Sequence, residues 1–143
     1  SIGSNGITKD KIEGDKKTPK GTYSLGAVYY REDRVQKPKT KLNLIKIKKN
    51  MGWCDDPSSK YYNKLIKVNN KLKFERMYRR EHNYDLLIPI EYNTSKPIKY
   101  KGSAIFIHLT NNYKNTLGCI SLKKKDFLIL ISLIKKKTKI QIV

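Results

Sequence analysis

The sequence predicts a mainly β domain with one packed helix near its C-terminus. Several short runs of β-branched and aromatic residues are separated by Gly, Pro, Asn and Asp, a pattern typical of strands joined by turns. Only the segment 123–136 has apolar residues at helical spacing. The chain has 143 residues, 38% of them hydrophobic, which is the size and apolar content of one domain. We therefore expect residues 1–143 to fold as a single domain.

The first half of the chain predicts two strands and the turns around them. Residues 14–23 are rich in turn formers and lead into an extended segment at 23–30. Residues 42–48 mix Leu and Ile with Lys, which indicates a strand with one side facing solvent. The motif Gly-Trp-Cys-Asp-Asp-Pro at 52–57 contains several turn formers, and we expect it to end that strand.

Three further strands are predicted in the second half. Residues 85–92 form a β-prone run, although Pro89 restricts that strand to an edge or bulge position because proline lacks an amide hydrogen. Residues 103–109 are almost continuously β-prone, which indicates a buried strand. The alternating pattern of residues 139–143 predicts a final strand that completes a sheet.

The predicted helix has one apolar stripe between lysine-rich ends. The stripe has the i, i+3, i+4, i+7 spacing that places side chains on one side of a helix, and it consists of Phe127, Leu130, Ile131 and Ile134. Ser121 precedes the helix and has a side chain suited to an N-cap. We expect the helix to pack against the sheet by this stripe.

The formal net charge of +20 is large for this length and favours anionic partners. The positive residues are mostly Lys and are spread from Lys9 to Lys139, which indicates a bias of the whole composition as much as a binding patch. Nucleic-acid readers typically concentrate Arg among stacking aromatics, so nucleic acid is not the expected partner. The longest apolar run, residues 127–134, is far shorter than the ~20 residues that span a bilayer, and no membrane span is expected.

The two cysteines, Cys54 and Cys119, permit one disulfide or two free thiols. A metal site would need ligands such as these cysteines together with His82 and His108. No two of the four have the close spacing of a typical zinc site. We expect neither a metal nor another cofactor.

A histidine and a cysteine near the predicted buried strand suggest a base and a nucleophile. His108 lies near the end of the run 103–109, and Cys119 follows within Thr-Leu-Gly-Cys-Ile-Ser at 116–121. A thiol needs an adjacent base or a lowered pKa to attack an acyl carbon well at neutral pH. Gly118 lets a ligand approach the backbone, so the Gly118 and Cys119 amides can donate to an oxyanion. Taken alone, these residues support a structural cysteine and a core histidine equally well.

Ordered motifs along nearly the whole chain resemble one known family. They are Gly-Asp at 14–15, Thr-Pro-Lys-Gly-Thr-Tyr at 18–23, Gly-Trp-Cys-Asp-Asp-Pro at 52–57, Tyr-Asn at 62–63, Tyr-Asp at 84–85, Tyr-Asn at 92–93, Gly-Ser-Ala-Ile-Phe-Ile-His at 102–108 and Thr-Leu-Gly-Cys-Ile-Ser at 116–121. In this order they resemble the L,D-transpeptidase catalytic domain, the YkuD family of bacterial cell-wall enzymes. The resemblance is strongest to its short subgroup with the Gly-Trp-Cys-Asp-Asp-Pro motif.

The resemblance implies a β-sandwich with one packed helix and a thioester-forming cysteine. It assigns Cys119 as the nucleophile, His108 as the general base, and the Gly118 and Cys119 amides as the oxyanion hole. Two positions depart from the wider family. Leu117 stands where a second histidine is often found, and Ser121 stands where Arg or Asn often anchors the substrate.

The implied function is a peptidoglycan L,D-transpeptidase, a target of carbapenems. Cys119 would attack the bond between diaminopimelate and D-Ala in a tetrapeptide stem and pass the acyl group to an amine of another stem. Two alternatives stay open: an L,D-carboxypeptidase that hydrolyses the same bond, and a non-catalytic basic module that binds cell wall or nucleic acid. The candidate substrate-binding residues are Thr116, Ser121, Trp53, Asp55 and Arg79.

These candidates have structural interpretations as well. Asp55 belongs to a motif that suits a turn, Trp53 suits a core, and Arg79 lies in a basic run that suits solvent. The expected partners are peptidoglycan stem peptides, and the expected state is a monomer. The sequence starts at Ser1 without a recognisable export signal. The expected location, the periplasm or the cell-wall face of a bacterium, therefore rests on the substrate.

Overall fold

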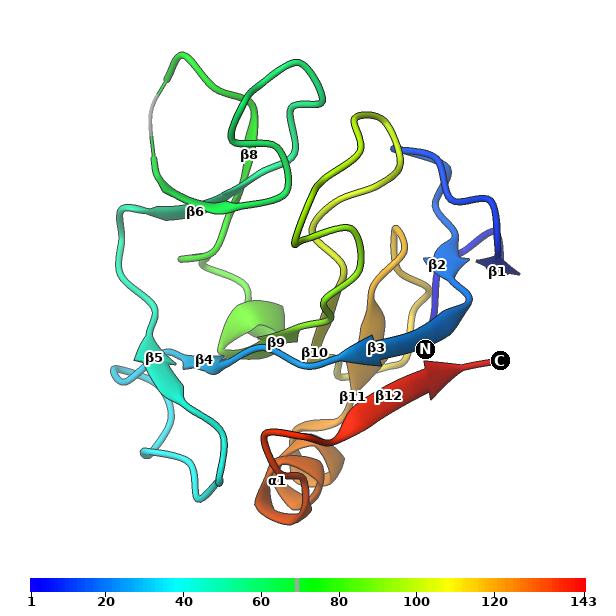
Figure 1. Cartoon of the computed structure of the whole chain (residues 1–143). Coiled ribbons are helices and arrows are strands. Elements are labelled where there is room, and N and C mark those ends of the chain that lie inside the picture. Colours follow the sequence, from blue (N-terminus) through cyan, green and yellow to red (C-terminus); the bar gives the residue numbers. More distant parts are fainter. Residues whose placement is uncertain (69) are drawn as a thin grey trace.

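The computed structural model of the chain describes residues 1–68 and 70–143, and it confirms a mainly β fold with a single α-helix near the C-terminus (Figure 1). The strands are β1 (Ile7–Thr8), β2 (Thr18–Pro19), β3 (Gly21–Ser24), β4 (Val28–Tyr30), β5 (Leu44–Lys46), β6 (Met51–Cys54), β7 (Leu65–Lys67), β8 (Phe74–Arg76), β9 (Leu86–Pro89), β10 (Phe106–Leu109), β11 (Ile120–Leu122) and β12 (Lys139–Ile142). The helices are the 3₁₀ turn η1 (His82–Tyr84) and α1 (Lys124–Leu133).

A five-stranded sheet in the order β11-β10-β9-β4-β5 forms the centre of the fold. The outer pairs β10–β11 and β4–β5 are parallel, and β9 runs antiparallel to both of its neighbours. Smaller sheets surround it: β7-β6-β8, the pair β12-β3 and the pair β1-β2. The segment predicted at 23–30 is thus divided between β3 and β4, which belong to different sheets.

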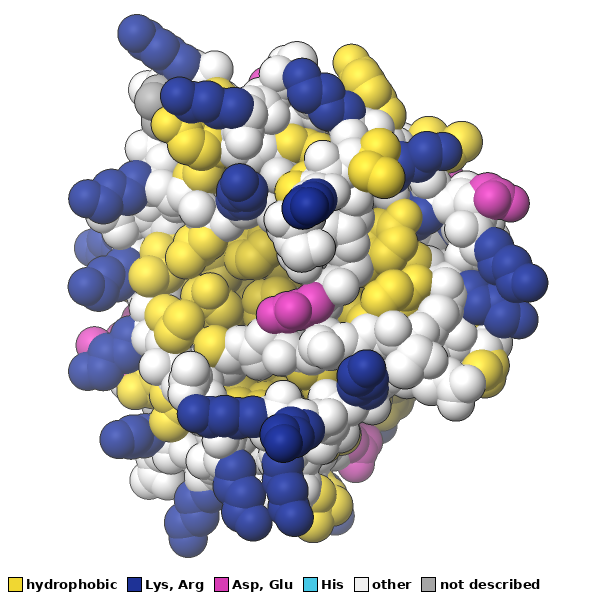
Figure 2. Space-filling model, viewed as in Figure 1, with side chains coloured by type: hydrophobic (Ala, Val, Ile, Leu, Met, Phe, Trp, Pro, Cys, Tyr) yellow, Lys and Arg dark blue, Asp and Glu magenta, His cyan; other side chains and the backbone are white. Residues whose placement is uncertain are grey.

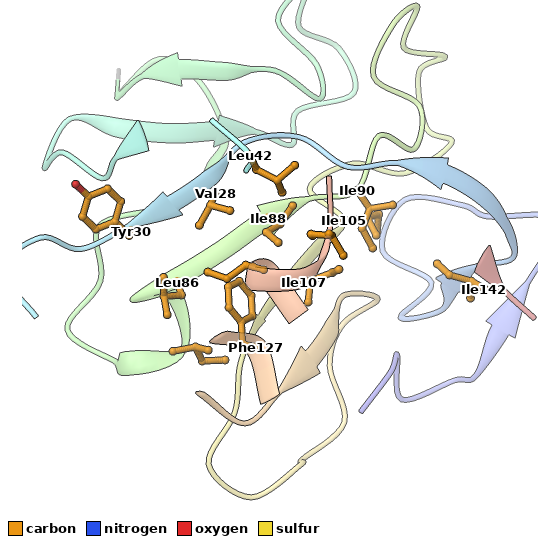
Figure 3. Packing of buried hydrophobic residues seen from close by; sticks show 13 residues of the cluster. Val28, Tyr30, Leu42, Leu86, Ile88, Ile90, Ile105, Ile107, Phe127 and Ile142 are labelled. Carbon is orange, nitrogen blue, oxygen red and sulfur yellow. The ribbon is translucent and has the colours of Figure 1, made fainter. Parts of the chain in front are cut away.

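Alternation along the central strands gives the sheet two apolar faces. One face packs against α1 and the β12-β3 pair, and its buried residues are drawn as sticks in Figure 3. The other face packs against β6 and the segment that follows β8. In β10, Ile107 contributes to the first cluster and Phe106 to the second. Layers on both faces of the sheet are consistent with the β-sandwich that the resemblance implied.

The predicted helix is confirmed as α1, and its apolar stripe packs as expected. Phe127, Ile131 and Ile134 are buried against the first face, and Leu130 is partly buried there. The predicted N-cap is wrong. Lys123 occupies that position without a side-chain capping bond, because Ser121 already belongs to the middle of β11.

Two further expectations are corrected. Gly52, Trp53 and Cys54 do not form a turn but lie in β6, which is paired on both sides, and the turn begins only at Pro57. A Cβ on Gly52 would lie 2.7 Å from the Phe74 ring, so the glycine permits close packing of β6 and β8. Pro89 does not mark an edge strand. It is the last residue of the central strand β9, where its carbonyl accepts a hydrogen bond from the Gly26 amide.

Phe106 is fully buried beneath the site described below, and we expect Phe106→Ala to lower the free energy of unfolding by about 3–5 kcal/mol. The Trp53 and Tyr84 rings pack against it in T-shaped arrangements at centroid distances of 5.2 and 5.9 Å, so truncation leaves a cavity between them. Urea unfolding measures the loss. The control Phe74→Ala removes a partly exposed ring and should cost less. A loss below about 1 kcal/mol for Phe106→Ala would contradict this packing.

Candidate active site

Cys119 lies at the end of the loop that joins β10 to β11, immediately before β11. Gly118 fixes the course of this loop. It has a φ of +138°, and a Cβ there would lie 2.9 Å from the Lys17 carbonyl oxygen. The Gly118 carbonyl accepts a hydrogen bond of 2.9 Å from the Thr18 hydroxyl. The motif at 18–23 therefore holds the loop that presents the cysteine.

The Thr116 side chain stabilises the same loop by two hydrogen bonds within it. Its hydroxyl donates to the Cys119 carbonyl at 2.5 Å and accepts from the Gly118 amide at 3.1 Å. The Gly118 amide is thus occupied in this structure. The Cys119 amide has no acceptor in the described part of the chain, so it is the member of the expected oxyanion pair that stands free.

The Cys119 thiol is held by two backbone groups. It donates to the Ala104 carbonyl at 3.2 Å and accepts from the Phe106 amide at 3.3 Å. Burial raises the pKa of the thiol to about 12, and the negative charge of Glu75 acts in the same direction. At neutral pH the group is therefore a thiol, and it needs a base to become a nucleophile.

His108 is in β10 and is 9% exposed. Its Nδ1 lies 2.9 Å from the Leu109 carbonyl oxygen. A carbonyl only accepts, so Nδ1 carries the proton and Nε2 is left with a free lone pair. Burial lowers the pKa of His108, which keeps the imidazole neutral at pH 7. The ring is therefore prepared to accept a proton at Nε2.

Both groups face the same cleft. Phe106 and His108 are two residues apart on β10 and so point to the same face of the sheet, and the Phe106 amide contacts the Cys119 sulfur. The Tyr84 ring packs against both the Phe106 ring and the His108 ring. The cleft has a volume of about 1340 Å³, and both Cys119 and His108 line it. The cleft therefore contains the two kinds of group, a thiol and a neutral imidazole, that general-base-assisted nucleophilic attack requires.

Four of the five candidate substrate-binding residues line this cleft, namely Thr116, Ser121, Asp55 and Arg79. The parallel register of β10 and β11 places Ser121 opposite His108. Burial raises the pKa of Asp55, and its Oδ1 is buried without a hydrogen-bond partner among the described residues. Leu117, 77% exposed, stands at the rim beside the cysteine.

The fifth candidate, Trp53, does not line the cleft. It is buried beneath it with its ring against Phe106, and its indole nitrogen donates to the Asn63 side chain at 2.8 Å. The same Asn63 oxygen accepts from the Ala104 amide at 3.0 Å. Trp53 thus supports the backbone at Ala104, whose carbonyl binds the cysteine thiol.

The remaining cysteine and histidine lie apart from this chemistry. Both cysteines are free thiols, and Cys54 is buried in β6. His82 is at the rim of the cleft, with a largely exposed side chain whose Nδ1 lies 2.6 Å from a carboxylate oxygen of Asp85. Within the described part of the chain, neither residue is hydrogen-bonded to the Cys119 thiol.

Sequence reasoning missed the groups that hold the pair in place. The Leu109 and Ala104 carbonyls are backbone atoms, and no residue type marks their role. Glu75 and Tyr84 also line the cleft, yet neither stood out, although Tyr84 is in a motif that carried the resemblance. Their place in the cleft depends on the contact between β8 and η1, which only the folded structure shows.

Positive side chains are spread over the molecular face in Figure 2 rather than gathered at one place. Hydrophobic side chains occupy its central hollow. This distribution agrees with a charge bias of the whole composition. The cleft itself has both signs of charge, with Lys11, Glu13, Lys73 and Glu75 among its lining residues.

Fold and site together define a mainly β protein in which a thiol and an imidazole line one cleft. The family model described as the L,D-transpeptidase catalytic domain, YkuD, matches residues 1–142. The chain therefore belongs to the YkuD family, whose members are enzymes that act on peptidoglycan. No curated protein and no solved structure gives a significant match.

Proposed function

We propose that this protein is a peptidoglycan L,D-transpeptidase with Cys119 as nucleophile and His108 as general base. The observation that carries the proposal is the cleft shared by a backbone-held thiol and a neutral imidazole whose Nδ1 is bound to Leu109. Membership of a family that acts on peptidoglycan supports the substrate class. A binding module would need neither a free Nε2 nor a thiol in the same cleft.

In the first half-reaction, Cys119 Sγ attacks the carbonyl carbon of the diamino acid, at its L-centre, in a tetrapeptide stem. The thiol proton passes to His108 Nε2 as the S–C bond forms. The imidazolium then gives this proton to the nitrogen of the leaving D-Ala, and the C–N bond breaks. A thioester on Cys119 and free D-Ala result.

The developing oxyanion needs a donor. The free Cys119 amide is our candidate, because the Gly118 amide already donates to Thr116. Rotation of the Thr116 side chain about χ1 would move its oxygen away and release the Gly118 amide as the second donor. Thr116, Ser121, Asp55 and Arg79 remain the candidates for stem contacts, since all four line the cleft.

In the second half-reaction, an amine of another stem attacks the thioester. His108 Nε2 takes the amine proton and returns a proton to the sulfur, which regenerates the thiol and leaves an amide cross-link. Water in place of the amine would give an L,D-carboxypeptidase. The cleft volume of about 1340 Å³ is larger than the ~300–1,000 Å³ of ordinary ligand sites, which supports an acceptor stem beside the donor stem.

Product analysis tests the acceptor. We expect incubation with disaccharide-tetrapeptides to release one D-Ala per event and to yield cross-linked dimers, identified by mass spectrometry. Tripeptide stems without dimers would replace the transpeptidase with a carboxypeptidase. No change in the stems, with the same result for Cys119→Ala, would contradict both.

The proposed partners and location follow from this substrate. We propose that the protein works as a monomer at the cell-wall face or in the periplasm, where a net charge of +20 suits an anionic polymer. Within residues 1–68 and 70–143, no helix is long and apolar enough to cross a bilayer.

A further inference from the structure

Three side chains outside the proposed catalytic pair form a connected network on one wall of the cleft. Glu75 comes from β8, Arg79 from the segment after it, and Tyr84 from the end of η1. The Tyr84 hydroxyl donates to Glu75 Oε1 in a short hydrogen bond. Arg79 donates to the same oxygen at 2.7 Å, and its guanidinium lies 3.9 Å from the centroid of the Tyr84 ring. Tyr84 is thus fixed at its hydroxyl and on one ring face.

The network ends on the proposed base. The Tyr84 ring centroid lies 5.3 Å from that of His108, with the planes tilted by 54°. The Leu109 carbonyl is one residue from His108 in sequence and fixes a single ring nitrogen. One hydrogen bond leaves the tilt of an imidazole adjustable. The packed Tyr84 ring supplies a second constraint.

The same ring lies beside the support of the nucleophile. Tyr84 meets Phe106 at 5.9 Å, and the Phe106 amide donates to the Cys119 sulfur. Glu75 also acts on the nucleophile directly, because the negative charge of its carboxylate contributes to the raised pKa of Cys119. Tyr84 therefore touches the surroundings of both members of the pair, although it donates no hydrogen bond to either.

We infer that Tyr84 is a positioning residue that holds the His108 imidazole with Nε2 directed at the reacting atoms, and that Glu75 and Arg79 act by holding Tyr84. A tyrosine suits this role because its ring packs and its hydroxyl is anchored at a distance. Glu75 and Arg79 form an ion pair that is largely shielded from solvent, so its geometry is better fixed than that of an exposed pair. The inference deepens the proposed function. The kinetic test rests on that function, whereas the NMR test below does not.

The test uses Tyr84→Phe, which keeps the ring and removes the anchor, and Glu75→Ala, which removes the acceptor. For each we expect kcat to fall about 10-fold with KM within about 2-fold, since misalignment affects the transition state more than binding. If Glu75 acts through Tyr84, the double variant should lose about as much as either single variant. Losses that multiply would overturn this part of the inference.

Nitrogen NMR of the imidazole gives a readout that needs no substrate. The chain has two histidines, so His82→Asn assigns the His108 signals. We expect the native protein to show one neutral tautomer with a proton on Nδ1, and Tyr84→Phe to show broadened or mixed tautomer signals. The matched control Tyr92→Phe removes a hydroxyl that donates to the Lys101 carbonyl away from the cleft, and should leave kcat and the spectrum unchanged.

Unchanged kcat together with an unchanged His108 spectrum in Tyr84→Phe would overturn the inference. A changed spectrum in a protein that never turns over stem peptides would keep the positioning role and reject the proposed function. The test does not use Tyr84→Ala, because removing the buried ring could unfold the protein. Tyr84→Phe keeps the ring, so its result does not depend on a folding defect.

Discussion

Replacing Cys119 with alanine is expected to abolish both thioester formation and transfer, lowering kcat by at least about 10⁴-fold. The substitution removes the only atom in the proposed mechanism that bonds to substrate. Without the sulfur, the Phe106 amide and the Ala104 carbonyl lose this partner, so we expect the variant to fold with a free energy of unfolding lower by about 1–3 kcal/mol. Release of D-Ala from tetrapeptide stems measures the loss, and circular dichroism checks the fold.

Cys54→Ala is the matched control for this prediction. Cys54 is the other free cysteine, buried in β6, and it does not line the cleft. Its replacement should leave kcat within about 2-fold of the native value, because no proposed step involves it. Equal losses of kcat in the two variants would contradict the prediction, because the loss would then not be specific to the Cys119 thiol.

Replacing His108 with alanine is expected to lower kcat/KM by about 10³- to 10⁴-fold. The thiol has a pKa of about 12, so without a base almost none of it is thiolate at pH 7. His108→Gln tests the same point with a side chain of similar size that accepts no proton. Both variants should show the same loss, since the missing function is proton transfer rather than volume.

The pH profile of the native enzyme follows from the direction of the histidine shift. Burial lowers the pKa of His108 below its usual 6.5, so the neutral base persists under mildly acid conditions. Activity should therefore be retained at pH 6.5 and fall only when the pH drops through the lowered pKa. This acid limb should be missing from the residual activity of His108→Gln. An acid limb above pH 7 would contradict a neutral, buried base.

The sequence supports prediction of α1 and of the strands that face the core, because the spacing of their apolar residues reflects which side of each element is buried. Phe127 and Ile131 are buried at helical spacing, and the alternation of β10 gives two apolar faces. His108 and Cys119 were found for a different reason, since their motifs resemble those of a family. The spacing alone was equally compatible with a structural role.

The features that the sequence did not predict depend mostly on contacts between residues far apart in the chain. Gly52 and Trp53 were expected in a turn, and only pairing with β7 and β8 shows that they belong to a strand. Pro89 was expected at an edge, yet it ends the central strand, where its missing amide hydrogen is tolerated. The carbonyls of Leu109 and Ala104 have no sequence signature at all.

The central claim, that Cys119 is an acyl-accepting nucleophile, is tested most directly by intact-protein mass spectrometry after incubation with a carbapenem. Attack of the thiol on the β-lactam carbonyl opens the ring, so the protein should gain the mass of one carbapenem, located by peptide mapping to Cys119. Cys119→Ala should gain nothing, and Cys54→Ala should react like the native chain. An adduct that persists in Cys119→Ala, or no adduct in the native protein, would contradict the assignment.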